Sequence, residues 1–158
     1  MLIGGDASAV SDCQPLLETI SDHTLHLGPS GAGATMKLVV NLVLGLNRAV
    51  LAEGLSLGES CGLEPAQVLS VLRQSPAYSG VMDTKGSKMI QEDFSPQARL
   101  AQHLKDVQLI LQLGDEHSQN LSLSQVHQSL LETAVELGYA DADNSAVIMA
   151  SRSKRNTA

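Results

Sequence analysis

The chain has 158 residues, enough for one compact domain or for a domain plus a fragment, and a chain of this size buries roughly 70% of its unfolded surface. Hydrophobic residues make up 43% of it and aromatic residues only 2%, so the core has to be built from Leu, Val, Ala and Met, which favours helix packing. The formal net charge of −7 argues against a nucleic-acid surface, which needs clustered Lys and Arg.

Two short strands with a helix between them are predicted before residue 28. Residues 1–5 form a short apolar run that ends in glycines, and residues 24–27 read as a second strand. Asp6 or Ser8 can cap a helix over residues 9–20. Because a parallel sheet usually has several strands with helices on both faces, this single unit indicates that the chain starts inside a domain.

The longest predicted helix follows a glycine-rich turn, residues 28–33, and ends at Gly62. Between residues 36 and 57 apolar side chains occupy almost every direction around a 3.6-residue period, which is the pattern of a buried helix. The polar exceptions are Lys37 and Asn41, four residues apart on one face, and Arg48 farther along it. This polar strip has to face something polar.

Further helices are predicted from proline, serine and glycine signals together with apolar spacing. They cover residues 64–75, 95–114, 122–138 and 146–151, with a less regular helical segment over residues 78–91. Asp143, Asn144 and Ser145 can cap the last of them. The basic tail that starts at Arg152 is predicted to be a frayed terminus rather than a binding arm.

Cys13 and Cys61 lack the spacing of a zinc site or of a disulfide framework, so both are predicted to be buried reduced thiols and no metal site is expected. Residues 38–52 are apolar, but Asn41, Asn47 and Arg48 interrupt them before the roughly 20 apolar residues that a membrane span needs. No secretory signal peptide is recognised at the start. A cytoplasmic protein without membrane or nucleic-acid partners is therefore expected.

The glycine turn and Lys37 carry the candidate chemistry. Its spacing, G-x-x-G-x-G, is the reverse of the dinucleotide fingerprint, and a loop that needs positive φ before a helix explains it equally well. A lysine in an apolar opening turn lies near the positive end of the helix dipole, and burial and the dipole would both favour its neutral amine. Such an amine can exchange a proton with a carbonyl or an alcohol, while Asn41 orients the same small substrate.

The motif Gly28-x-x-Gly31-x-Gly33-x-x-x-Lys37-x-x-x-Asn41 resembles the mid-chain motif of the β-hydroxyacid dehydrogenases. This family includes 3-hydroxyisobutyrate dehydrogenase, tartronate semialdehyde reductase and glyoxylate/succinic semialdehyde reductase. The likeness extends over nearly the whole chain. Residues 1–6 resemble the last strand region of the family's Rossmann domain, residues 13–17 the helix after it, and residues 26–28 the crossing into the helical domain. Residues 94–96 followed by 105–109 resemble the family's second block, and residues 138–147 its closing one.

The resemblance implies a mainly α fold, the multi-helical 6-phosphogluconate-dehydrogenase-like C-terminal domain with a long buried helix, preceded by a short β-α-β remnant of a Rossmann domain. Residues 1–27 would end the NAD(P)-binding domain, and residues 28–158 would form the substrate and dimerisation domain. The implied partners are an N-terminal Rossmann domain missing from this chain, a small hydroxyacid or semialdehyde, and further copies in a homodimer or higher homo-oligomer.

The implied parent is an NAD- or NADP-dependent oxidoreductase that passes hydride between a nicotinamide and a short β-hydroxyacid or its semialdehyde. The implied site residues are Lys37 as catalytic proton donor and acceptor, Asn41, Gly31 and Gly33 as substrate contacts, and Lys105 and Asp106 on the cofactor side. By spacing alone, the last two fit a solvated helix face equally well. The isolated chain, lacking the cofactor loop, is expected to be inactive, and the alternative is a non-catalytic helical oligomerisation or interaction module derived from the family.

Overall fold

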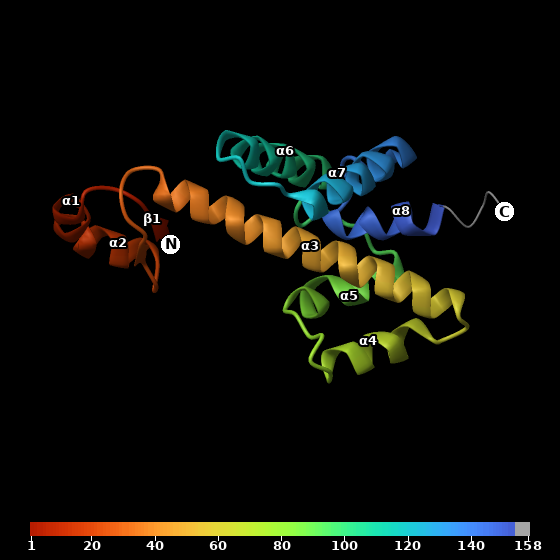
Figure 1. Ribbon diagram of the computed structural model, residues 1–158. Coiled ribbons are helices and arrows are strands. Elements are labelled where there is room, and N and C mark those ends of the chain that lie inside the picture. The colour runs from red at the N-terminus through yellow and green to blue at the C-terminus, as the bar shows by residue number, and fades with distance from the viewer. Residues whose placement is uncertain (154–158) are drawn as a thin grey trace. The chain divides into compact units, whose positions relative to one another are not determined.

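The computed structural model describes residues 1–153 and confirms the mainly α fold, with one two-stranded sheet among these residues (Figure 1). The longest helix, α3 (Ala32–Ser60), lies where the sequence predicted it. Contacts between residues group the chain into two units, residues 1–41 and 42–158, which divide within α3. The domain boundary expected between residues 27 and 28 stays a prediction.

The first unit contains the predicted strand, helix and strand. Its elements are β1 (Leu2–Ile3), α1 (Ala7–Asp12), α2 (Gln14–Ile20) and β2 (Leu25–His26). The two strands pair in parallel, with Leu2 opposite Leu25 and Ile3 opposite His26. Such a pair needs a crossover connection, which α1 and α2 supply.

The single helix predicted between these strands is two helices. Asp6 caps α1, because its side chain accepts hydrogen bonds from the backbone N–H groups of Ser8 and Ala9. The chain turns at Cys13, and Pro15 lies in the first turn of α2, where its missing N–H leaves no hydrogen bond unmade. Inside a continuous helix Pro15 would remove one hydrogen bond and crowd the preceding turn, which is the reason for the break.

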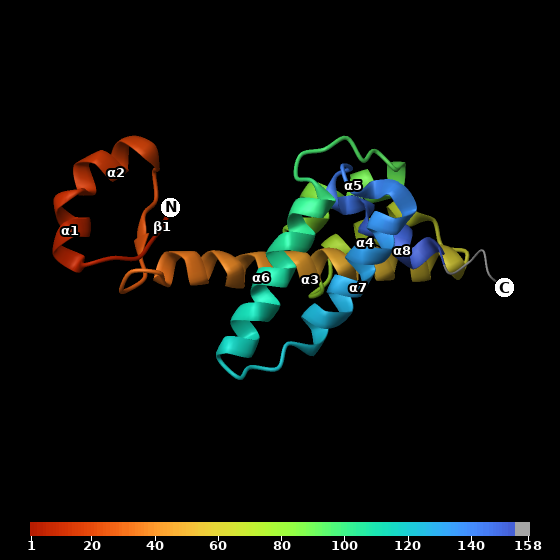
Figure 2. The ribbon, with the colours of Figure 1, turned by 90° about the horizontal axis from the view of Figure 1, so that it is seen from above.

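In the second unit, helices pack on opposite sides of the C-terminal half of α3. Figure 1 shows α4 and α5 on one side and α6, α7 and α8 on the other, and Figure 2 shows α6 and α7 from above. The elements are α4 (Pro65–Arg73), α5 (Val81–Gln91), α6 (Leu100–Glu116), α7 (Ser122–Ala134), a π-helical turn η1 (Val135–Tyr139), a 3-10 helix η2 (Asn144–Val147) and α8 (Ile148–Ser153). Gly62 and Gly138 end helical segments with φ of +83° and +93°, as predicted.

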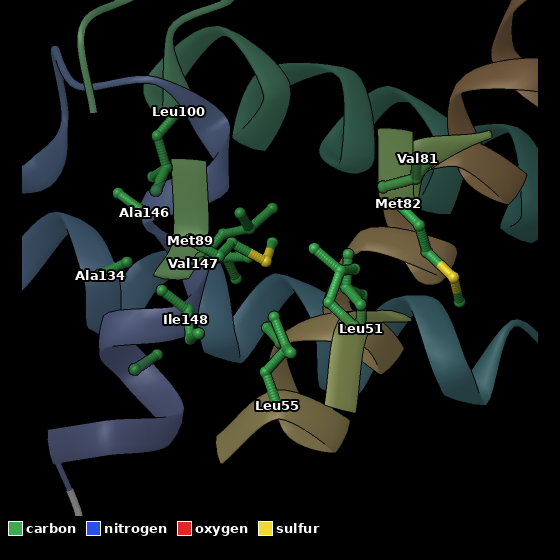
Figure 3. Packing of buried hydrophobic residues seen from close by; sticks show 14 of the residues in the cluster. Leu51, Leu55, Val81, Met82, Met89, Leu100, Ala134, Ala146, Val147 and Ile148 are labelled. Atoms are coloured by element: carbon green, nitrogen blue, oxygen red, sulfur yellow. The ribbon is translucent and has the colours of Figure 1, made fainter. Parts of the chain in front are cut away.

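The core of the second unit is aliphatic. Leu51 and Leu55 of α3 converge with Met89 of α5 and with Val147 and Ile148 near the C-terminus (Figure 3), and each of these side chains is at most 2% exposed. Full burial of one such side chain stabilises a fold by about 1.5–3 kcal/mol. The chain therefore builds its core almost without aromatic residues.

The prediction that α3 is buried on all sides is wrong. Val50 and Leu57 are 68% and 66% exposed, and Val43 and Leu44 are exposed as well. The physical reason is coverage, because the neighbouring helices of the second unit lie on two sides of α3 (Figure 1) and do not cover these apolar side chains. By length and composition α3 also qualifies as a candidate membrane span, a test that the core helices of soluble proteins pass too.

Two smaller predictions are also corrected. Cys13 and Cys61 are free, exposed thiols rather than buried ones, because both lie at helix ends. Arg152 is not part of a frayed terminus, since it lies in α8 and its guanidinium pairs with Glu59 at 3.3 Å and with Glu92 at 2.8 Å. The remaining basic residues of that tail, Lys154 and Arg155, lie outside the described residues.

Candidate functional site

Lys37 and Asn41 lie one turn apart near the start of α3, as the motif requires. Lys37 is exposed and Asn41 is half-buried. The expected burial of Lys37 is therefore wrong for this chain by itself. Within residues 1–41, the close packing on this part of α3 occurs instead at Gly33, where β1 approaches the helix.

Gly31 and Gly33, the other residues predicted on the substrate side, meet two different backbone requirements. Gly31 has a φ of +92°, a conformation that glycine adopts without strain. A Cβ on Gly33 would lie 2.9 Å from the carbonyl oxygen of Leu2, closer than real Cβ atoms approach, and 3.0 Å from the amide nitrogen of Gly4. Gly33 therefore lets the first residues of α3 pack directly against β1. This packing explains the glycine at position 33 without a ligand.

The remaining predicted site residues lie on α6, in the second unit. Lys105 is exposed and Asp106 is half-buried. As consecutive helical residues their side chains point about 100° apart. The structure thus brings Gly31, Gly33 and the Lys37–Asn41 pair together at the opening of α3, whereas Lys105 and Asp106 belong to the other unit.

A buried ion pair that the sequence did not predict joins α5 to the turn before η2. Both carboxylate oxygens of Asp143 lie 2.9 Å from Lys85 Nζ, and neither residue is more than 10% exposed in its side chain. The same carboxylate accepts backbone hydrogen bonds from Gln97, Ala98 and Ser145 at 3.0–3.2 Å. Burial by itself would raise the pKa of Asp143, but these hydrogen bonds outweigh it and hold the pKa well below its ordinary value.

This network explains why α6 starts later than predicted, at Leu100 rather than near Ser95. The N–H groups of Leu100 and Ala101 donate to the carbonyl oxygens of Ala142 and Ala140 instead of to residues 96 and 97, as a helix begun near Ser95 would require. The carbonyl oxygen of Ala98 likewise accepts from the N–H of Asn144. Because these backbone groups form hydrogen bonds with residues 140–144, they do not extend α6 toward its N-terminus.

A second buried polar cluster lies where α3 crosses α6 and α7. It consists of Arg48, His103 and His127, and we call it the Arg48 cluster. The two imidazole rings lie 5.1 Å apart between centroids. A Cβ on Gly45 would lie 2.6 Å from both rings, so the glycine lets the histidines reach the surface of α3.

Burial governs the charge of this cluster. It lowers the pKa of Arg48 to about 10, although nearby Asp143 acts in the opposite direction, so the guanidinium stays protonated at neutral pH. Burial and the positive charge of Arg48 together lower the pKa of His103 to about 3 and that of His127 to about 4. Both imidazoles are therefore neutral at physiological pH.

We expect the second unit to lose stability in mild acid because of these two histidines. Unfolded histidine has a pKa near 6.5. Below that pH the unfolded chain binds protons that the folded chain does not. The free energy of unfolding therefore decreases as the pH is lowered from about 6.5 to about 4. The contribution is about 1 kcal/mol per pH unit for each histidine. Urea denaturation at several pH values measures it.

The variant His127→Leu should flatten this pH dependence, whereas His117→Gln, at an exposed position after α6, should leave it unchanged. An unchanged slope in His127→Leu would contradict the assignment. The signal for these residues was present in the sequence, because His103 and His127 each occupy a core-facing helical position. His103 follows Leu100 by three residues, and His127 precedes Leu131 by four.

Comparison with known proteins places this helical fold in a class. Residues 31–151 match the family model described as NAD-binding of NADP-dependent 3-hydroxyisobutyrate dehydrogenase. The Mycobacterium tuberculosis 3-hydroxyisobutyrate dehydrogenase solved with L-serine has the same fold, with a TM-score of 0.86 and 25% identity over 96% of this chain and 54% of that one. The fold is thus one that is found in hydroxyacid dehydrogenases, over about half of the solved chain. The chain belongs to the β-hydroxyacid dehydrogenase family, as its motifs indicated.

Two curated relatives show the breadth of the family. The chain is 34% identical to the 2-(hydroxymethyl)glutarate dehydrogenase of Eubacterium barkeri, over 94% of this chain and 50% of the relative. It is 32% identical to the cytokine-like nuclear factor N-PAC of Aedes aegypti, over 96% of this chain and 27% of that protein. The chain therefore spans about half the length of the dehydrogenase and about a quarter of the nuclear factor.

Proposed function

We propose that this chain supplies the C-terminal helical domain of an NAD- or NADP-dependent oxidoreductase that interconverts a small β-hydroxyacid and its semialdehyde or oxo form. The observation that carries the proposal is the match of residues 31–151 to the family model, with Lys37 and Asn41 at the family's motif spacing on α3. Residues 1–27 would end the dinucleotide-binding domain, and the cytoplasm would be the compartment.

In this proposal Lys37 and Asn41 act on the substrate, and the nicotinamide supplies or accepts the hydride. The ammonium of Lys37 donates a proton to the carbonyl oxygen during reduction, and the neutral amine takes it back from the hydroxyl during oxidation. The amide of Asn41 hydrogen-bonds the substrate and fixes its orientation. Lys105 and Asp106 would lie on the cofactor side.

The residues present fit the substrate half of such a site better than the cofactor half. Lys37 is exposed at the opening of α3 and is accessible to a small acid. The 158 residues contain no G-x-G-x-x-G loop that would hold a pyrophosphate. The Rossmann domain of the parent would supply that loop and the wall that covers Lys37.

Calorimetric titration of the full-length parent with NADH and NADPH, followed by assays with a panel of short semialdehydes, tests the function. We expect one nicotinamide to bind and at least one semialdehyde to be reduced. A parent that binds neither nicotinamide would refute the oxidoreductase proposal.

The isolated chain should show no hydride transfer with NADH or NADPH and the semialdehyde that the parent reduces. The physical reason is that the proton donor alone cannot position a nicotinamide against the substrate. Absorbance at 340 nm measures the turnover, with the parent at equal concentration as the positive control. Measurable turnover by the isolated chain would contradict the division of labour between the two domains.

The second candidate is a non-catalytic helical oligomerisation or interaction module derived from the same family. The similarity to N-PAC favours it, because that relative's name describes a nuclear factor and not an enzyme. Lys37 and Asn41 separate the candidates, since a pure scaffold has no use for a proton donor beside an amide.

Both candidates predict self-association. Val50 and Leu57 of α3 and Leu123 and Val126 of α7 are 60–71% exposed, and burying such side chains between copies is favourable. We expect a homodimer or higher homo-oligomer by sedimentation at high micromolar concentration. The double variant Val50→Lys, Leu57→Lys should dissociate it, whereas Leu109→Lys on α6 serves as the matched control. A monomeric wild type would contradict the prediction.

A further inference from the structure

The interior of the second unit holds more positive than negative charge. Among its described residues, the charged side chains that are buried are Arg48, Lys85 and Asp143. Asp143 forms an ion pair with Lys85, with 2.9 Å between Oδ2 and Nζ. The same carboxylate acts on Arg48 only from a distance, so this buried cation has no carboxylate in contact with it, and a buried charge without a paired counterion is strongly unfavourable.

The Arg48 cluster also presents hydrogen-bond donors without acceptors. Arg48 Nε and Nη1 and the Nε2 atoms of His103 and His127 are buried and have no hydrogen-bond partner within residues 1–153. Each of these nitrogens can carry a hydrogen, the imidazole nitrogens in the Nε2–H tautomer. The three side chains come from α3, α6 and α7, are at least nine-tenths buried, and meet beside Gly45.

We propose that Arg48, His103 and His127 form an internal binding site for a small monovalent anion, a halide or a carboxylate the size of formate. One negative charge balances the single unpaired guanidinium, because both imidazoles are neutral at physiological pH. The anion accepts the N–H groups that the chain leaves unpaired. We specify a small ion because the two rings close on α3 at Gly45, where a Cβ would lie 2.6 Å from both.

The site is separate from the proposed dehydrogenase chemistry. Arg48 follows Lys37 by three helical turns along α3, and neither histidine is among the residues proposed to contact the substrate or the cofactor. An anion bound there would stabilise the crossing of α3 with α6 and α7, so it would act on the stability of the second unit. The proposal therefore does not depend on the proposed function.

Thermal unfolding of the whole chain in sodium bromide, compared with sodium gluconate at equal ionic strength, tests the site. Bromide at about 100 times its Kd should raise Tm by several degrees, because a ligand that binds only the folded state stabilises it. Gluconate is a much larger monovalent anion, and a site for a small ion should not bind it. Arg48→Met should lose the bromide dependence, and Arg99→Met, at an exposed position before α6, should keep it. A bromide effect that persists in Arg48→Met would overturn the proposal.

Crystals of the wild-type chain soaked in sodium bromide give a readout that does not require the variant to fold. We expect an anomalous bromide peak within hydrogen-bond distance of Arg48 and of both imidazoles. Ordered waters alone at the cluster would overturn the proposal. A peak seen only at molar bromide, without a shift in Tm, would mean an adventitious ion only and would overturn it as well.

Discussion

In the full-length parent, the variant Lys37→Ala should lower kcat by about 10²-fold or more while leaving the affinity for the nicotinamide nearly unchanged. The reason is that the alcohol oxygen would have to take its proton from water in place of a positioned ammonium. Steady-state kinetics with the preferred semialdehyde, together with calorimetric binding of the cofactor, separate the two effects.

Lys88→Ala is the matched control for this experiment. Lys88 lies on α5, where its ammonium donates to Asp93 at 3.4 Å and to Ser95 at 3.0 Å, so its loss removes a lysine without touching the proposed chemistry. A near-normal kcat in Lys37→Ala would remove Lys37 from the mechanism. Together with the exposure of Lys37, that result would favour the non-catalytic module.

Replacement of Asp143 by alanine should destabilise the isolated chain by about 3–5 kcal/mol, because it leaves the ammonium of Lys85 buried without its counterion. The backbone N–H groups of Gln97, Ala98 and Ser145 also lose their acceptor. Asp143→Asn should cost less, since its amide oxygen can still accept. The free energy of unfolding from urea denaturation measures the loss.

Asp141→Ala provides the comparison two residues away. The Asp141 side chain is 88% exposed and its ion pair with Arg99 lies at 3.6 Å in solvent, so its removal should cost less than about 1 kcal/mol. Equal losses in Asp141→Ala and Asp143→Ala would contradict the role of the buried network.

Local signals in the chain predicted most of the helical elements. Asp6 and Asp143 cap helical segments with their side chains, and Pro65 stands in the first turn of α4, as expected. Gly62 and Gly138 mark helix ends because only glycine takes positive φ without strain. Such signals act within a few residues, so they can be read before the fold is known.

The motif from Gly31 to Asn41 could likewise be recognised from spacing, and the family it indicated is confirmed. The roles of Lys37, Asn41 and Lys105 stay predictions. The expected burial of Lys37 was wrong because periodicity reports that residues share a face and not what covers that face.

The sequence by itself determined the helical class, the position of α3 and the family, because helix signals, apolar period and motif spacing are local properties of the chain. Only the tertiary structure decided which side of α3 is covered, where α6 begins, and that Lys85 meets Asp143 across 58 residues. It also decided that Arg48 shares its buried surroundings with two histidines. Charges buried far apart in sequence meet only when helices pack, and no local pattern records which helix faces which.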